Sequence, residues 1–203
     1  MVIEEVDEEV FLPDGYLERF STYPVENQTQ LKGRDDELKN LKIAYENCKI
    51  NNAPLLVVSD FGEGSSSLMY SSISLYENVK IIENKSAIHS QEKLLKILKE
   101  VFELEGDYKN ISALKEDLFA QERNYVIVFE NIERMFLREI GGFKLIEEFL
   151  LFVHRTKLRV YWVITVKKYS NYFLSNVKLF SSNFSSVLRL SPMSNDVLIE
   201  ELV

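Results

Sequence analysis

One stretch of the chain, residues 55–68, combines a strand pattern, a glycine loop and a helix start. The apolar run Leu55–Val58 is typical of a buried strand. Gly62 and Gly64 then indicate a tight loop, and the serines before Leu68 indicate the first turn of a helix. Backbone amides of such a loop converge on one point, where the helix dipole favours an anion. The stretch therefore predicts either a phosphate-binding loop or an ordinary strand-to-helix turn.

The phosphate-loop pattern G-x-x-x-x-G-K-[ST] matches this stretch only in part. Gly64 stands at the second glycine and Ser66 at the hydroxyl position. Ser59 replaces the first glycine, and Ser65 replaces the lysine. That lysine normally forms charge-assisted hydrogen bonds to the outer phosphates, each worth about 1.5–3 kcal/mol, so its absence predicts roughly tenfold to hundredfold weaker binding. Glu63 adds a negative charge where a polyanion would dock.

The net charge of the chain limits its partners. A formal charge of −8 and a pI near 5.0, with scattered basic residues, argue against a nucleic-acid surface. Cys48 is the only cysteine and the chain has two histidines, so neither a disulfide framework nor a metal cluster is expected. No apolar run approaches the roughly 18 residues that span a bilayer. We therefore expect a soluble, cytoplasmic protein without a membrane segment.

Strand patterns and helix patterns alternate along the rest of the chain. The further strand patterns occupy residues 79–83, 125–129, 159–165 and 187–190. The helix patterns occupy residues 35–50, 66–76, 111–119, 143–153, 167–174 and 196–202, with another that Ser90 caps and Gly106 ends. This alternation predicts an α/β fold with a mostly parallel sheet of about five strands and helices on both faces.

Polar side chains stand at the ends of three predicted strands. Ligands in folds of this kind bind at the carboxyl ends of the strands. That edge would carry Ser59–Ser66 after the first strand, Glu130 and Asn131 after another, and Thr165 at the end of a third. We expect these groups to meet at one place, which an ordinary turn would not require.

In the order of these parts, residues 31–203 resemble the AAA+ and STAND group of P-loop ATPases, and within it the origin-recognition-like and bacterial ATP-binding-protein branches. The segments that carry the resemblance are Leu31–Leu38 (the Gly-Arg-x-x-Glu-Leu segment near the adenine), Ser59–Ser66 (the phosphate loop), Val126–Glu133 (the Walker B strand), Val163–Thr165 (the strand with the polar sensor) and Leu190–Ser194 (the entry to the helical lid). The resemblance implies a P-loop NTPase-like three-layer sandwich that takes ATP or ADP with Mg²⁺.

The resemblance also implies a set of site residues. Those that would contact the nucleotide are Gly33, Arg34, Gly62, Gly64, Ser65, Ser66, Ser67, Glu130, Asn131 and Thr165. Ser66 and Glu130 would hold the metal ion, Glu130 through water.

Three devices for hydrolysis are missing together. Position 65 lacks the lysine, Asn131 replaces the carboxylate that activates water, and no lid arginine is visible. An amide does not accept a proton at neutral pH, so we assign no catalytic residue. The first hypothesis is a pseudo-ATPase that serves as a regulatory or protein-interaction scaffold, with weak or no ATP binding. The alternative is a functional ATP-binding or ATPase module that uses Ser65, Ser66, magnesium and a basic group from elsewhere.

Three segments are predicted. Residues 1–30 form an acidic arm, either a partner-binding segment or an extension packed on its own domain; residues 31–190 form the AAA+-like core. Residues 191–203 would begin a truncated helical lid, as expected for part of a longer polypeptide. Arg134 and Arg138 would act on a neighbouring molecule or simply belong to the charged surface. We expect protein partners.

Overall fold

The computed structural model describes residues 24–25, 31–136, 141–176, 180–184 and 186–192. Most of the predicted arm and lid, the predicted helix 196–202 and Arg138 lie outside these residues. In the described part of the chain, no helix is long and apolar enough to cross a membrane.

Five described strands form one sheet in the order β2-β3-β4-β1-β5, and every neighbouring pair is parallel. They are β1 (Leu55–Ser59), β2 (Val79–Ile82), β3 (Tyr125–Phe129), β4 (Val160–Lys167) and β5 (Ser186–Arg189). The prediction of a parallel sheet of about five strands is confirmed. Parallel order requires a crossover between consecutive strands, and the intervening helices supply it.

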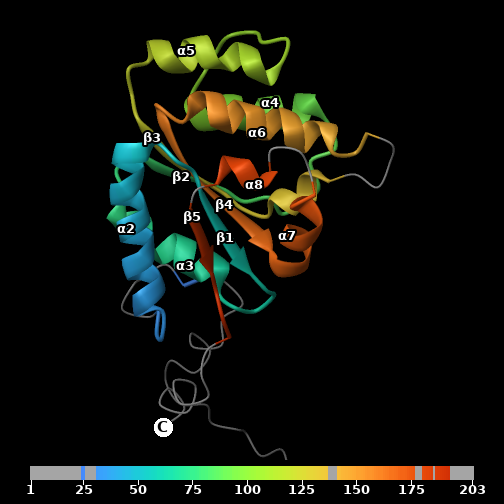
Figure 1. Ribbon diagram of the computed structural model, residues 1–203. Helices are drawn as coiled ribbons and strands as arrows, with labels where there is room; N and C mark the ends of the chain where they lie inside the picture. Colours follow the sequence, from blue (N-terminus) through green and yellow to red (C-terminus); the bar gives the residue numbers. More distant parts are fainter. Residues whose placement is uncertain (1–23, 26–30, 137–140, 177–179, 185, 193–203) are drawn as a thin grey trace, which may run out of the picture.

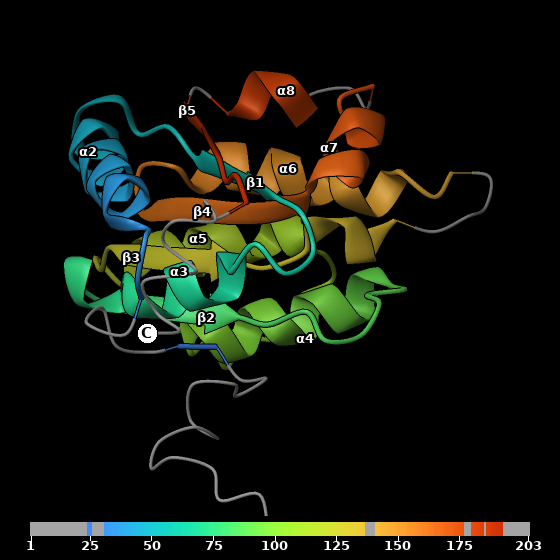
Figure 2. The ribbon, with the colours of Figure 1, turned by 90° about the horizontal axis from the view of Figure 1, so that it is seen from below.

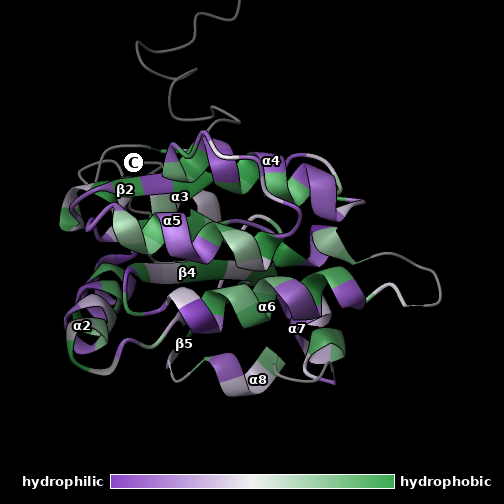
Figure 3. Ribbon diagram, turned by 90° about the horizontal axis from the view of Figure 1, so that it is seen from above, coloured by the Kyte–Doolittle hydropathy of each residue, from purple (hydrophilic) through white to green (hydrophobic). Residues whose placement is uncertain are grey.

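Helices cover both faces of this sheet (Figure 1). They are α2 (Asp35–Asn51), α3 (Ser65–Ser71), α4 (Gln91–Phe102), α5 (Leu114–Ala120), α6 (Lys144–Thr156), α7 (Lys168–Leu174) and α8 (Phe180–Asn183), with short 3₁₀ turns η2 (Ile73–Leu75), η3 (Ile111–Ala113) and η4 (Ile132–Met135). Helices α2 and α3 pack on one face, and α4, α5, α6 and α8 pack on the other. Hydrophobic and hydrophilic residues alternate around α4, α5 and α6, as expected for helices that lie on a core (Figure 3).

Strand β4 shows how one strand serves two cores. Trp162, Ile164 and Val166 belong to the core under α4 and α6, whereas Tyr161 and Val163 belong to the core under α2 and α3. Successive side chains of a strand point to opposite faces, so a strand covered on both sides is apolar throughout.

The ends of α4 and α3 differ from the predictions for identifiable reasons. Gly106 does not end α4, because the helix stops at Phe102 and Glu103 adopts the left-handed conformation (φ 56°). Gly106 instead allows a close approach, since a Cβ there would lie 2.6 Å from the ring of Tyr108. Helix α3 is shorter than predicted: it ends at Ser71, and the hydroxyl of Ser72 donates to the carbonyl of Met69 at 2.8 Å.

Candidate functional site

Four polar residues lie at the carboxyl edge of the sheet on the face that carries α3. The apolar residues of β1, β3 and β4 in the core under α2 and α3 occupy alternate positions, such as Val57, Val128 and Val163. Residues two positions apart on a strand share a face, so Ser59 lies on the same face as Val57, and Glu130 on the same face as Val128. In the same way, Thr165 and Lys167 lie two and four positions after Val163 on that face. Three neighbouring strands therefore bring hydroxyl, carboxylate and ammonium groups to one edge.

Ser66 and Glu130, the predicted metal ligands, contact each other. Glu130 is 5% exposed, and burial raises the pKa of its carboxyl above the usual range. A hydrogen bond from the Ser66 hydroxyl opposes this rise, as do the nearby charges of Lys167 and Lys85, while Glu83 adds to it. The contact joins the first turn of α3 to the end of β3.

Asn131 and Thr165 also lie together. The backbone N–H of Asn131 donates to the Thr165 hydroxyl at 2.9 Å, and Thr165 is buried. Asn131 adopts the left-handed conformation with φ 55°, which asparagine tolerates better than most residues. Thr165 therefore fixes the turn that follows β3.

The glycine loop after β1 is partly closed by its own carboxylates. Gly62 and Gly64 have φ values of 78° and 74°, and a Cβ at either position would meet no atom within 4 Å. The Glu63 carboxylate accepts a hydrogen bond from the backbone N–H of Asp60 at 2.5 Å. The Asp60 carboxylate accepts from the N–H of Phe61 at 2.8 Å. Two loop amides are thus already bonded to negatively charged groups.

The substitution Glu63→Gln should raise the affinity for a phosphate ligand roughly threefold to tenfold. The glutamine oxygen can still accept from Asp60, so the loop keeps its shape while the repulsive charge is removed. Isothermal titration with magnesium-ATP measures the change. The matched control is Glu77→Gln, an exposed residue just before β2 at the opposite edge of the sheet. Equal affinities for all three proteins would contradict this account of Glu63.

Arg34 connects three separate segments. Its side chain is buried, and its guanidinium forms an ion pair with Glu37 at 2.6 Å. The same group donates to the backbone carbonyls of Glu63 (2.9 Å) and Ser191 (2.7 Å). Gly33, with φ 65°, forms the turn before it. Arg34 therefore ties the start of α2, the glycine loop and the segment after β5 together.

The remaining predicted residues, Ser65 and Ser67, differ in their surroundings. Ser65 is 7% exposed and begins α3. The Ser67 hydroxyl accepts from the backbone N–H of Val25 at 3.1 Å, and the Ser71 hydroxyl donates to the Val25 carbonyl at 3.0 Å. The hydroxyl of Ser67 thus binds an N-terminal residue of the chain.

Sequence reasoning missed two residues near this edge, Lys167 and Glu133. The predicted strand ended at Thr165 and the predicted helix began at Lys167, whereas β4 continues to Lys167 and α7 follows it (Figure 2). The alternation of Thr165, Val166 and Lys167 is the signal that could have extended the strand. Glu133 lies in η4; burial raises the pKa of its carboxyl, and the backbone N–H groups of Glu133 and Lys167 donate to it.

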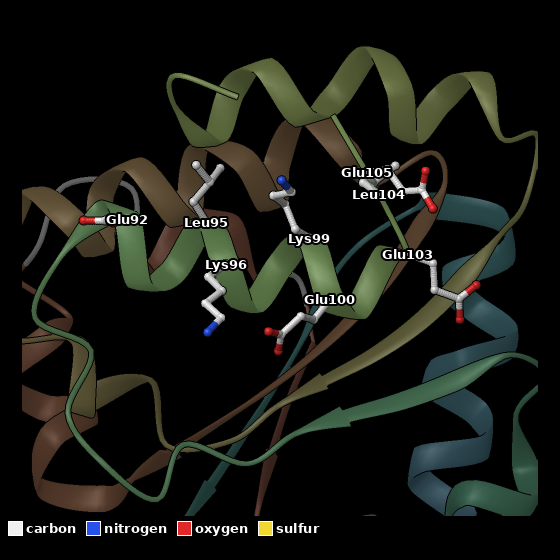
Figure 4. A pocket seen from close by; sticks show the side chains of 8 residues that line it. All are labelled: Glu92, Leu95, Lys96, Lys99, Glu100, Glu103, Leu104 and Glu105. Carbon is white, nitrogen blue, oxygen red and sulfur yellow. The ribbon is translucent and has the colours of Figure 1, made fainter. Parts of the chain in front are cut away.

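A shallow pocket lies elsewhere, along α4 (Figure 4). Its lining residues are Glu92, Leu95, Lys96, Lys99, Glu100, Glu103, Leu104 and Glu105. Glu103 is paired with Lys80 at 2.5 Å, and Arg123 lies 3.8 Å from its other oxygen. The pocket contains none of the predicted site residues, and we do not regard it as the functional site.

The parallel sheet in the order β2-β3-β4-β1-β5, with a glycine loop after β1 and an acidic residue after β3, is a P-loop NTPase-like fold. No protein-family model matches the chain, and no curated protein matches it in sequence.

Several solved structures share the fold. The Walker-type ATPase PABY2304 of Pyrococcus abyssi is similar with a TM-score of 0.61 and 17% identity, over 91% of this chain and 60% of that one. Cdc6p from Pyrobaculum aerophilum is similar with a TM-score of 0.66 and 15% identity, over 92% of this chain and 52% of that one. The ORC1 protein of Aeropyrum pernix, solved in complex with DNA, is similar with a TM-score of 0.62 and 17% identity, over 92% of this chain and 51% of that one. The chain therefore spans about half to three fifths of the length of these proteins, and at such identities the likeness shows the fold.

Proposed function

We propose that this chain is a pseudo-ATPase domain that binds a magnesium nucleotide weakly, does not hydrolyse it and acts as a scaffold for protein contacts. The observation that carries the proposal is Asn131, which follows Glu130 at the position where the AAA+ group that the sequence resembles has a carboxylate base. Its N–H bonds to Thr165, and its side-chain amide does not take a proton from water.

The residues present fit a magnesium nucleotide. The Ser66 hydroxyl and the Glu130 carboxylate already contact each other, and a bound Mg²⁺ would neutralise part of the phosphate charge there. No group of three or more His, Cys, Asp or Glu side chains in the described residues could hold a metal alone. That finding agrees with the usual mode of Mg²⁺, which takes one or two carboxylates together with phosphate oxygens. The Ser59 hydroxyl is buried and makes no hydrogen bond, so a polar group remains to be paired at the start of the loop.

Weak nucleotide binding follows from three features of the loop and its surroundings. Ser65 has no charge, Glu63 repels phosphate, and the Arg34 guanidinium is already bonded to Glu37 and two carbonyls. A dissociation constant of roughly 0.1–1 mM is therefore expected for ATP.

One observation favours the alternative, an active ATPase with substitute residues. Glu133 follows Asn131 by two residues, and one oxygen of its carboxylate is buried without a hydrogen-bond partner. Burial also raises the pKa of this carboxyl, as a general base requires. Loss of any measured turnover in Glu133→Gln would support this alternative.

Titration calorimetry with magnesium-ATP and magnesium-ADP, together with a phosphate-release assay, tests the proposal. We expect weak binding and no turnover above the buffer rate. Binding should weaken as the pH falls, because burial raises the pKa of Glu130 and a protonated carboxyl no longer attracts Mg²⁺. Glu130→Gln should reduce this pH dependence. Micromolar affinity with steady phosphate release would overturn the proposal.

A further inference from the structure

We propose that Lys167, at the end of β4, supplies the cation that faces the outer phosphates of a nucleoside di- or triphosphate, in place of the lysine that position 65 lacks. This inference rests on the nucleotide-binding part of the proposed function. It does not depend on whether the bound nucleotide is hydrolysed.

The sheet register places Lys167 beside the loop. Lys167 lies opposite Ser59 in the parallel pair β1 and β4, and Ser59 is the first residue of the phosphate-loop pattern. Lys167 also shares a face of β4 with Thr165, the face that carries α3. Its backbone is therefore held by the sheet next to the point where the loop begins.

The side chain of Lys167 extends toward the loop and the Glu130 carboxylate. Its ammonium lies 5.1 Å from the centroid of the Phe61 ring, and Phe61 belongs to the loop. The same charge lowers the pKa values of Glu130 and Glu133 in opposition to their burial. A phosphate bound through Mg²⁺ at Ser66 and Glu130 would lie within the field of this ammonium.

Among the residues that the structure describes, the other cations near this edge are engaged or exposed; Arg134, for example, is exposed and donates to the backbone carbonyl of Lys85. The guanidinium of Arg34 is bonded to Glu37 and to two carbonyls. Lys85 is paired with Glu83 at 2.6 Å, and its side chain is 86% exposed. Lys167, in contrast, is half-buried and forms no ion pair within 4.0 Å with a described residue. Lysine suits this role because its ammonium is a compact charge on a flexible stem.

The competing explanation is structural: Lys167 would only offset the buried charges of Glu130 and Glu133. The length of the phosphate chain separates the two roles. A lysine that faces the outer phosphates affects ATP and inorganic tripolyphosphate but not AMP. A lysine that only supports the fold changes the melting temperature of the ligand-free protein and affects all ligands alike.

The test compares wild type with Lys167→Met, using calorimetric titration with magnesium-ATP, magnesium tripolyphosphate and AMP. The matched control is Lys168→Met, since Lys168 is the exposed neighbour that begins α7. We expect Lys167→Met to weaken ATP and tripolyphosphate binding roughly tenfold to hundredfold and to leave AMP binding unchanged. Lys168→Met should change each affinity less than about twofold.

A double variant, Ser65→Lys with Lys167→Met, should recover most of the lost ATP affinity. Such recovery would also show that the protein folds without Lys167. Lys167→Gln serves if the methionine variant does not fold. Unchanged ATP binding in Lys167→Met, or an equal loss for ATP and AMP, would overturn the inference while leaving the pseudo-ATPase proposal intact. Absence of ATP binding by wild type at millimolar concentration would overturn both. Steady hydrolysis by wild type, with weaker ATP binding in Lys167→Met, would overturn only the pseudo-ATPase proposal.

Discussion

Replacement of Arg34 by methionine should lower the free energy of unfolding by about 3–5 kcal/mol. The side chain of Arg34 is 3% exposed, and its removal leaves the carboxylate of Glu37 and the carbonyls of Glu63 and Ser191 without this partner. A group that loses its partner costs about 1–3 kcal/mol where it is shielded from water. Glu37 and Glu63 are half-buried whereas Ser191 is exposed, so the first two account for most of the expected loss. Urea denaturation followed by the fluorescence of Trp162, the only tryptophan and a fully buried one, measures the loss.

Two further variants control for this result. Arg34→Lys keeps the charge but loses the planar fork, so it should give an intermediate loss. Arg123→Met removes an arginine that is 66% exposed and lies 3.8 Å from Glu103, so it should cost less than about 0.5 kcal/mol. A loss below about 1 kcal/mol for Arg34→Met would mean that the chain does not depend on this junction.

The substitution Ser65→Lys should raise the affinity for magnesium-ATP about tenfold. It restores the charge that the phosphate-loop pattern places before the hydroxyl of Ser66. The gain should lie at the lower end of the range for a charge-assisted hydrogen bond if Lys167 already neutralises part of the phosphate charge. A loop that is only a strand-to-helix turn would gain nothing, and this outcome separates the two interpretations of residues 55–68.

Titration calorimetry measures the gain, and Asn124→Lys is the matched control. Asn124 is exposed and immediately precedes β3, at the edge of the sheet away from the loop. An equal rise in affinity for both variants would reflect the reduced net negative charge of the protein rather than a phosphate-binding loop.

Much of the sheet could be predicted from local pattern. The run Tyr125–Phe129 coincides with β3, since a continuous β-branched and aromatic run has few alternatives in a two-faced sheet. The end of β4 could not be placed so well, because lysines after Thr165 fit a helix start as well as a strand end. Helix α8 was not predicted, since its four residues are too few to show a period.

The candidate site was predictable in its residue types but not in its contacts. Ser66 and Glu130 were expected near one another because both follow the carboxyl ends of parallel strands, but the hydrogen bond between them was not predicted. The fold of Glu63 back onto the N–H of Asp60 depends on loop dihedrals that no pattern specifies. The bond between Arg34 and Ser191 joins residues 157 positions apart, a separation beyond any local signal.

The two carbonyls held by Arg34 make the glycine loop and the segment after β5 a single mechanical unit. The carbonyl of Ser191 cannot move away from Glu63 without breaking one of the two hydrogen bonds of 2.7 and 2.9 Å. A protein that pulls on the chain beyond β5 therefore does work on the loop, and a ligand that stiffens the loop resists that pull. By thermodynamic reciprocity, the bound protein would change the affinity of the chain for the ligand, and the ligand its affinity for the protein, by the same factor.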